Sequence, residues 1–317
     1  VSGRTMGIRA DMPPQVARID AHSLNKSGTV RLCYAGTVMQ SRADNMLASR
    51  TPIKVGAELF GESGRVSDLE IVSLMIESLK VLGIDDIHIE LGDVSIFRQL
   101  VDAANLEEPV QSELFELVQR KAFAELKDIV DELDLDADIG SLIKEVPSLC
   151  GHDVLANATE LFKNHPSIVS RLENLQWITD GVRSRFPDVD IYYDLSELRG
   201  YNYHTGIVFA AYVGNSGRTI AKGGRYDHIG EVFGRRRGAT GFDVNLKSLA
   251  SQTTAFVDSR KVVLTTVSED VTEKERWDKI QSLREEGFIV VESGESSDNH
   301  DFELIYMSGE WRLQEIV

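Results

Sequence analysis

The chain has 317 residues, of which 42% are hydrophobic, and its 51 acidic and 34 basic side chains give a net charge of −17. At about 150 residues per domain, this length predicts two domains, each large enough to bury a core. The acid excess argues against nucleic-acid binding, which requires Lys and Arg along the phosphates. The one dense basic run, Arg235-Arg236-Arg237, is too short to supply such a surface.

The cysteine and hydropathy patterns bear on the compartment. Cys33 and Cys150 are too few for a disulfide framework, and no Cys or His spacing is typical of a zinc site. No apolar run approaches the roughly 20 residues needed to cross a bilayer, and no basic and apolar leader opens the sequence. We therefore expect a cytoplasmic protein that binds no metal and contacts no membrane.

The first third of the chain alternates between strand and helix patterns. Two apolar runs within residues 30–61, joined by a polar link, predict a long antiparallel hairpin. Ser67 and Glu70 match the S-x-x-E capping box, and apolar residues then recur at helical spacing until Gly83. Residues 86–92 alternate like a strand, and a second short helix is expected to open near Ser95.

The remainder predicts an α+β protein with two additions. Residues 107–187 have helical periodicity and are expected to form a helical insertion, after which strands are expected at 189–195, 203–213 and 219–223. A helix through Val244, Leu246 and Leu249 should follow a GATGF turn. Residues 257–317 predict strand, helix, strand and strand, a small α/β module. Residues 1–250 are therefore expected to form an antiparallel sheet flanked by helices, interrupted by the insertion.

The segment from Glu197 to Tyr212 is rich in polar and aromatic groups. We expect a strand that presents a charged fork and rings on alternating faces, from Arg199, Tyr201, Tyr203 and His204. The guanidinium of an arginine offers a planar pair of donors that matches a carboxylate, which lysine does not reproduce. The alternative is a surface arginine beside aromatic residues that pack a half-buried sheet.

Residues 221–230 contain a second candidate segment. Gly223-Gly224 permits a bend or a close approach of the backbone, and Tyr226 follows between two charged residues. The alternative is an ordinary turn. The segment contains neither of the glycine patterns that bind phosphate groups.

Two further segments carry acidic residues in unusual places. Glu58 lies within an apolar strand, where an inward carboxylate would need a cationic partner or a proton. Alternation alone leaves an outward Glu58 equally open. Arg9 and Asp11 precede Pro13-Pro14, and their alternative role is a surface ion pair before a helix.

In chain order these segments resemble the catalytic core of histidyl-tRNA synthetase. The resemblance spans about residues 7–249 and rests on GIRAD, RLCYAG with GAELFG, RGYNYHTG, GGRYD and GATGF. RGYNYHTG and GGRYD correspond to the two peptides that distinguish the histidine enzyme from other class II synthetases. The resemblance implies an antiparallel sheet flanked by helices, a helical insertion and self-association.

The resemblance fails where the family binds ATP. Gln40 stands where the synthetases have the arginine that holds the α-phosphate. Lys247 and Ser248 replace a glutamate-arginine pair. Because transfer from ATP depends on cations that neutralise the triphosphate, we expect no catalysis. The C-terminal module is also short for an anticodon-binding domain.

The amino-acid site of the family is better preserved. The resemblance implies a histidine-binding site formed by Asp11, Glu58, Arg199, Tyr203, His204 and Tyr226. The arginine would pair with the carboxylate of histidine, the two acidic residues would face its α-ammonium group, and the three aromatic residues would border its imidazole. Lys54 stands where the family usually has a glutamine, and a cation there should point away from the ammonium group or reduce the affinity.

The wording GxRAD, RTPxxxGAExFG and LRGYxYHTG is closer to the regulatory subunits of ATP phosphoribosyltransferase than to the synthetases. That resemblance implies a non-catalytic subunit without a cofactor. It would bind and activate the short-form catalytic subunit and mediate feedback inhibition by L-histidine in the first step of histidine biosynthesis. The insertion and residues 235–237 are the candidate partner surfaces. Two alternatives remain: a divergent histidyl-tRNA synthetase and a stand-alone histidine-binding sensor.

Overall fold

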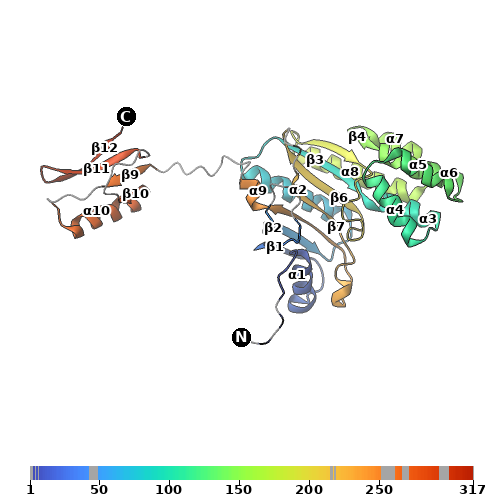
Figure 1. The fold of residues 1–317 in the computed structure, drawn as a ribbon, viewed down its shortest axis with the longest axis horizontal. Helices are drawn as coiled ribbons and strands as arrows, with labels where there is room; N and C mark the ends of the chain where they lie inside the picture. The colour runs from blue at the N-terminus through green and yellow to red at the C-terminus, as the bar shows by residue number, and fades with distance from the viewer. Residues whose placement is uncertain are drawn as a thin grey trace. The chain divides into compact units, whose positions relative to one another are not determined.

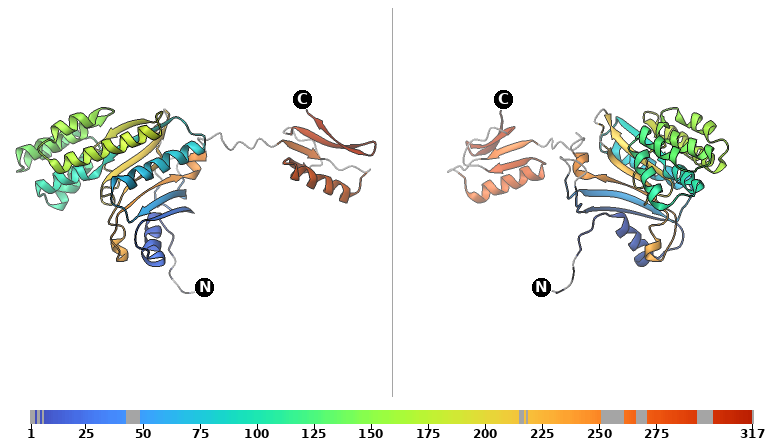
Figure 2. Two further views of the ribbon diagram at one scale, coloured as in Figure 1. Left: turned by 180° about the vertical axis from the view of Figure 1, so that it is seen from behind. Right: turned by 45° about the vertical axis from the view of Figure 1, so that its right-hand side comes forward.

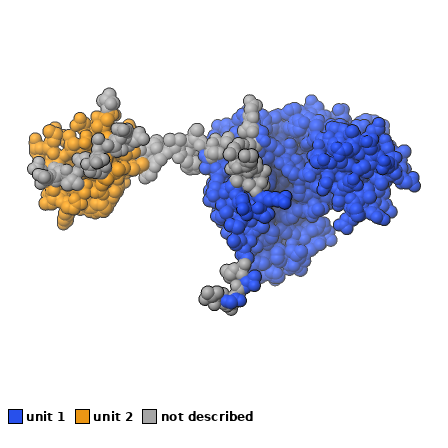
Figure 3. Space-filling model, viewed as in Figure 1, with its two compact units in different colours: residues 1–253 blue, residues 254–317 orange. Residues whose placement is uncertain are grey.

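The computed structural model describes the whole chain except residues 1, 2, 4, 6, 43–48, 215, 216, 218, 251–260, 266–270, 293–299 and 317. The chain divides into two compact units, residues 1–253 and 254–317 (Figure 3). The link of the predicted hairpin lies partly outside the described residues, as does residue 257, the expected start of the C-terminal module.

Unit 1 is built on an eight-stranded sheet with the order β1-β2-β8-β7-β6-β3-β5-β4 (Figure 1). Adjacent strands run antiparallel, except that β3 and β5 are parallel. The α+β, class II synthetase-like fold is thus confirmed, but the sheet is mixed because the chain crosses from β3 to β5 through helices. The strands are β1 (Val30–Thr37), β2 (Ile53–Phe60), β3 (Ile87–Asp93), β4 (Cys150–Gly151), β5 (Asp190–Asp194), β6 (Ile207–Val213), β7 (Thr219–Arg225) and β8 (Ala239–Asn245).

Helices cover one face of this sheet (Figure 2). Helices α2 and α8 pack against each other, and they contact β8 and β3 respectively. Met75 and Leu79 of α2 are fully buried and belong to the same hydrophobic core as the sheet residues Ile89 and Leu91. The helices before and after the insertion are α1 (Pro13–Arg18), the π-helical segment η1 (Ile19–Leu24), α2 (Arg65–Val81), α3 (Val94–Ala104), the short 3₁₀ segment η4 (Glu231–Phe233) and α9 (Leu246–Ala250).

The predicted insertion is helical. Its helices gather at the β3–β5–β4 end of the sheet, where α3 contacts α6 and α7 contacts α8 (Figure 1). They are α4 (Glu108–Gln119), α5 (Phe123–Glu132), α6 (Ala137–Glu145), the 3₁₀ turn η2 (Val146–Ser148), α7 (Val154–Leu161) and α8 (Pro166–Arg185). The short strand β4 within this region was not expected.

The capping box predicted at Ser67 and Glu70 is wrong. Helix α2 begins at Arg65, two residues earlier. Ser67 therefore lies inside the first turn, where its buried hydroxyl donates to the carbonyl of Gly64 at 2.7 Å. Glu70 instead pairs with Arg31 on β1 at 2.5 Å.

Two strand assignments also differ from the structure. The strand expected from residue 203 begins only at Ile207, because Gly200 has a φ of +68° and its carbonyl accepts from the amides of Tyr203 and His204. The expected alternation of side chains along this segment is therefore wrong. Residues 239–242 of the GATGF segment lie in β8 and not in a turn, and the helix after it spans only Leu246–Ala250.

Unit 2 has a four-stranded sheet with the order β10-β9-β11-β12. It contains the predicted strand, helix, strand and strand, and the sequence analysis missed β12. Helix α10 opens with a capping box between Thr272 and Glu275. The elements are β9 (Val262–Thr265), α10 (Glu273–Glu285), β10 (Ile289–Glu292), β11 (Phe302–Met307) and β12 (Glu310–Glu315). In the part of the chain that the structure describes, no helix has both the length and the apolar character to span a membrane.

Candidate functional site

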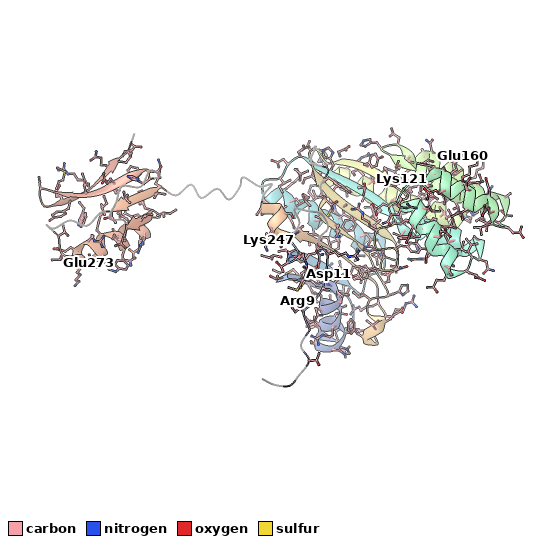
Figure 4. All side chains as sticks on the ribbon, viewed as in Figure 1. Arg9, Asp11, Lys121, Glu160, Lys247 and Glu273 are labelled. Carbon is pink, nitrogen blue, oxygen red and sulfur yellow. The ribbon has the colours of Figure 1, made fainter. Side chains whose placement is uncertain are left out.

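A pocket of about 520 Å³ lies on the face of the sheet opposite α2 and α8, and Pro13 and Pro14 at the start of α1 contribute to its lining. The side is fixed by alternation along β2, because Leu59 packs into the helical core and its neighbour Glu58 lines the pocket. The pocket brings together all six residues that the resemblance assigned to histidine: Asp11, Glu58, Arg199, Tyr203, His204 and Tyr226. Asp11 comes from the segment just before α1 (Figure 4).

The strand register builds the floor of the pocket from two adjacent rows of residues. One row runs through Glu58, Gly241, Gly224 and Val208, and the other through Asp243, Lys222, Ala210 and Glu90. A Cβ atom on Gly241 would collide with the carboxylate of Glu58, and one on Gly224 would approach the His204 ring to 2.8 Å. Glycine in these strands therefore leaves the space that the polar side chains occupy.

Glu58 points into the pocket and is only 2% exposed. Its carboxylate accepts hydrogen bonds from the hydroxyls of Tyr34, at 3.1 Å, and Tyr226. Burial raises the pKa of Glu58 to about 8, although both tyrosines oppose that shift. The carboxyl group therefore takes up a proton near neutral pH unless a cation approaches it.

Three aromatic rings form one wall of the pocket. The rings of Tyr203 and Tyr226 stack at 4.8 Å, and the His204 ring meets that of Tyr203 edge-on at 5.1 Å. Burial lowers the pKa of His204 to about 4, so its imidazole is neutral at pH 7. The wall thus offers hydroxyl groups and a neutral ring, and it carries no positive charge.

Arg199 lies at the opposite side of the pocket with 44% of its side chain exposed. Its Nη2 atom contacts Glu90 at 2.9 Å and Glu197 at 2.8 Å. The same atom donates to the hydroxyl of Tyr212 at 3.1 Å. The guanidinium group is thereby oriented by two carboxylates, its Nη1 atom lies 3.5 Å from the hydroxyl of Thr219, and the side chain lines the pocket.

Lys54 does not carry a free positive charge. Its ammonium group pairs with Asp243 at 2.5 Å, and both side chains are largely buried. The sequence analysis missed Asp243 because it assigned the GATGF glycines to a turn. The alternation of Phe242, Asp243 and Val244 is the signal that could have found it, since the two apolar residues belong to the core.

Other arginines singled out by sequence serve the fold. Arg225 is 4% exposed on the helical face, where it pairs with Asp68 of α2 at 2.8 Å. Arg237 reaches Asp20 at 3.2 Å, and Arg235 donates to the carbonyl of Asp20 at 3.0 Å. Arg236 pairs with Glu231 at 3.1 Å, so all three arginines at 235–237 have partners within the chain, which weakens the expectation that this run contacts a partner.

Acidic side chains outnumber basic ones in the described pocket lining. Among the described residues, its lining contains the cations Arg199 and Lys222 and the carboxylates of Asp11, Glu58, Glu90, Glu197 and Asp243. Lys247, at the position of the lost glutamate-arginine pair, donates to the carbonyl of Thr51 at 3.1 Å. Within the described ranges no group of three or more His, Cys, Asp or Glu side chains is arranged to hold a metal ion.

Comparison with known proteins agrees with this architecture. The model of the family "Histidyl-tRNA synthetase" matches residues 1–249. The fold and this match define a histidyl-tRNA synthetase-like protein. The chain is 43% identical over 324 residues to the ATP phosphoribosyltransferase regulatory subunit of Pseudomonas putida, with 98% of this chain and 80% of the relative covered. The chain belongs to the family of ATP phosphoribosyltransferase regulatory subunits.

Solved structures show the same fold. An ATP phosphoribosyltransferase regulatory subunit/histidyl-tRNA synthetase from Bacillus halodurans superposes with a TM-score of 0.75 at 24% identity, covering 90% of this chain and 73% of that one. An ATP phosphoribosyl transferase (HisG:HisZ) complex from Thermotoga maritima gives a TM-score of 0.58 at 18% identity, covering 75% and 80%.

Proposed function

We propose that this chain is a non-catalytic subunit that binds L-histidine and associates with the short-form catalytic subunit of ATP phosphoribosyltransferase. The observation that carries the proposal is a single pocket that joins an oriented arginine, several carboxylates and a neutral aromatic wall. The family of the chain supports the partner, and the neighbouring Thermotoga maritima structure is itself a complex of that enzyme.

Each group of histidine has a chemical counterpart in the pocket. Arg199 presents a planar guanidinium to a carboxylate. Asp11 and Glu58 attract the α-ammonium group, and its approach favours the ionised form of Glu58. The imidazole would lie against Tyr203, His204 and Tyr226, whose polar atoms reject side chains without ring nitrogens because buried partners would be left unpaired.

The same charges argue against ATP chemistry. A triphosphate would meet four acidic side chains besides the protonated Glu58 and two cations in the described lining, and one of those cations, Arg199, is held by Glu90 and Glu197. Repulsion of this kind lowers the local concentration of an anionic substrate. We therefore propose a binding subunit that needs no cofactor.

Regulation follows from linkage between two binding events. Histidine inhibits the partner enzyme if it binds one conformation of the complex more tightly than another, and a coupling of about 1–3 kcal/mol is typical. Association without histidine would favour the active conformation. Self-association of this chain is part of the proposal, as in the synthetases it resembles.

Mixing the purified chain with a short-form catalytic subunit tests this function. We expect a complex by size-exclusion chromatography, a higher turnover than that of the catalytic subunit alone, and a loss of that gain when L-histidine is added. Unchanged turnover and separate elution would refute the proposal. Histidine-dependent exchange of pyrophosphate into ATP by the chain alone would favour an active synthetase instead.

Replacement of the pocket arginine tests the ligand. Arg199→Ala removes the group that pairs with the carboxylate, so binding of L-histidine should fall at least about 100-fold by calorimetry, as expected for a lost charge-assisted pair. Arg236→Ala is the matched control, because Arg236 is exposed and pairs with Glu231 outside the pocket lining. Equal affinities of the two variants would show that Arg199 does not bind the ligand.

A further inference from the structure

The loop of residues 198–206, which enters β6, has two functional sides. On one side Arg199, Tyr203 and His204 line the pocket. On the other side the ring of Tyr201 packs between two helices, at 5.0 Å from the ring of Phe115 in α4 and 6.0 Å from that of Phe97 in α3. One short loop therefore contacts both the pocket and the first helix of the insertion.

Arg98 of α3 holds this loop from the helical side. Its Nη2 atom donates to the carbonyls of Tyr201, at 2.5 Å, and His204, at 3.0 Å. The guanidinium group also lies over the Tyr201 ring, 4.6 Å from its centroid. Both ends of the four-residue segment 201–204 are thus fixed by one side chain, which itself does not line the pocket.

The strand side of the loop has a separate anchor. The amide of Thr205 donates to the carbonyl of Arg225 at 2.7 Å, and the ring of His204 lies 3.3 Å from the same carbonyl. Just before these anchors the backbone turns through Gly200, whose φ of +68° favours glycine. A shift of Tyr203 or His204 must therefore move Tyr201 or break the bonds to Arg98, since few free dihedrals separate them.

We propose that Arg98 is the positioning residue of the pocket and that, through the contact of Tyr201 with Phe115, the 198–206 loop couples occupancy of the pocket to helix α4. This proposal rests on the proposed function, because it takes histidine as the ligand that occupies the pocket. Helix α4 presents Glu113 and Glu116 to solvent, so a shift of α4 changes a surface outside the pocket. The loop is the element that both sites contact, as coupling between distant sites requires.

Hydrogen–deuterium exchange of the full chain with and without L-histidine, joined to calorimetry, tests this coupling. In the unaltered chain, histidine should slow exchange in residues 201–206 and also in 108–119. Arg98→Gln should weaken histidine binding at least about tenfold, since two charge-assisted hydrogen bonds are lost, and should abolish the slowing in 108–119. Arg98→Lys should restore part of both effects because lysine retains a charged donor.

Arg65→Gln is the matched control. Arg65 lies over the ring of Trp177 at 4.5 Å, so the substitution removes a similar cation–π contact away from the loop. It should leave histidine affinity and the exchange of 108–119 as they are in the unaltered chain. If Arg98→Gln behaves like Arg65→Gln, the proposal is wrong.

The remaining outcomes also decide the question. If the unaltered chain binds no histidine, the proposed function fails. The role of Arg98 as an anchor of the loop is then tested without ligand: faster hydrogen–deuterium exchange of 201–206 in Arg98→Gln supports that role, and unchanged exchange refutes it. If Arg98→Gln does not fold, the comparison passes to Arg98→Lys. Weaker histidine binding together with reduced slowing at 108–119 in that variant supports the proposal, whereas full affinity with full slowing overturns it.

Discussion

The two faces of the eight-stranded sheet are formed by the same strands, but they differ in how buried ionisable side chains are paired. On the helical face, Arg225 is 4% exposed, is matched by Asp68 at 2.8 Å and also donates to the hydroxyl of Ser67. On the pocket face, Glu58 is similarly buried, but its hydrogen-bond partners among the described residues are the hydroxyls of Tyr34 and Tyr226, and burial raises its pKa to about 8. The buried ion pair therefore stabilises the helical face, whereas the carboxyl group of Glu58 on the pocket face remains available to a cationic ligand.

The comparison shows how one strand serves both faces. Gly224 and Arg225 are neighbours on β7, yet the first leaves room for His204 and the second binds α2. Because side chains alternate along a strand, binding and stability can be altered almost independently. Three predictions test that separation, beginning with the largest effect.

Arg225→Met should destabilise unit 1 by about 3–5 kcal/mol, because it leaves Asp68 buried without its cation. Chemical denaturation measures the change. The double variant Arg225→Met with Asp68→Asn should regain part of the loss, since neither charge then remains. A loss below about 1 kcal/mol in the single variant would mean that this ion pair contributes little to the helical face.

Gly241→Ala should act mainly on the pocket face. The added Cβ meets the carboxylate of Glu58, so the side chain must shift, and we expect a destabilisation of about 1–3 kcal/mol with loss of histidine binding. Gly7→Ala is the control, because a Cβ there meets no atom within 4 Å. Unchanged calorimetric binding by Gly241→Ala would show that the glycine floor does not shape the site.

Glu58→Gln should remove a pH dependence of stability. A carboxyl group whose pKa rises on folding from 4.5 to about 8 holds its proton more tightly in the folded state, so its contribution is present below pH 4.5 and is lost as the pH rises toward 8. The slope is at most about 1.4 kcal/mol per pH unit. Denaturation at several pH values should give a flatter profile for Glu58→Gln than for the unaltered chain.

Glu70→Gln provides the opposite control for that experiment. The hydrogen bond from Arg31 lowers the pKa of Glu70, so this group adds stability above its unfolded pKa and loses it as the pH falls. The two substitutions should therefore change the slope of stability against pH with opposite signs. If both change the slope with the same sign, burial of Glu58 is not the cause of the pH dependence.

Local patterns predicted the β1–β2 hairpin and the body of α2, because alternation and helical periodicity report directly on burial. They could not decide whether Glu58 faces inward. Alternation shows which residues of a strand share a face of the sheet, but it does not show which of the two faces that is. The error at Tyr203 and His204 has a physical reason: aromatic residues suggest a strand, but the left-handed Gly200 turns the chain. Asp243 was missed because glycines that form a pocket floor resemble glycines of a turn.

The parallel pairing of β3 with β5 has a consequence for the history of the fold. Parallel neighbours require a long return connection, and here that connection contains α3 to α8. The entropy of closing a loop grows only slowly with its length. Helices could therefore be added to or removed from this connection while the register of β3 with β6, and with it the pocket floor, stayed the same. The connection between β3 and β5 is therefore a place where helices can add new surface with little effect on the pocket.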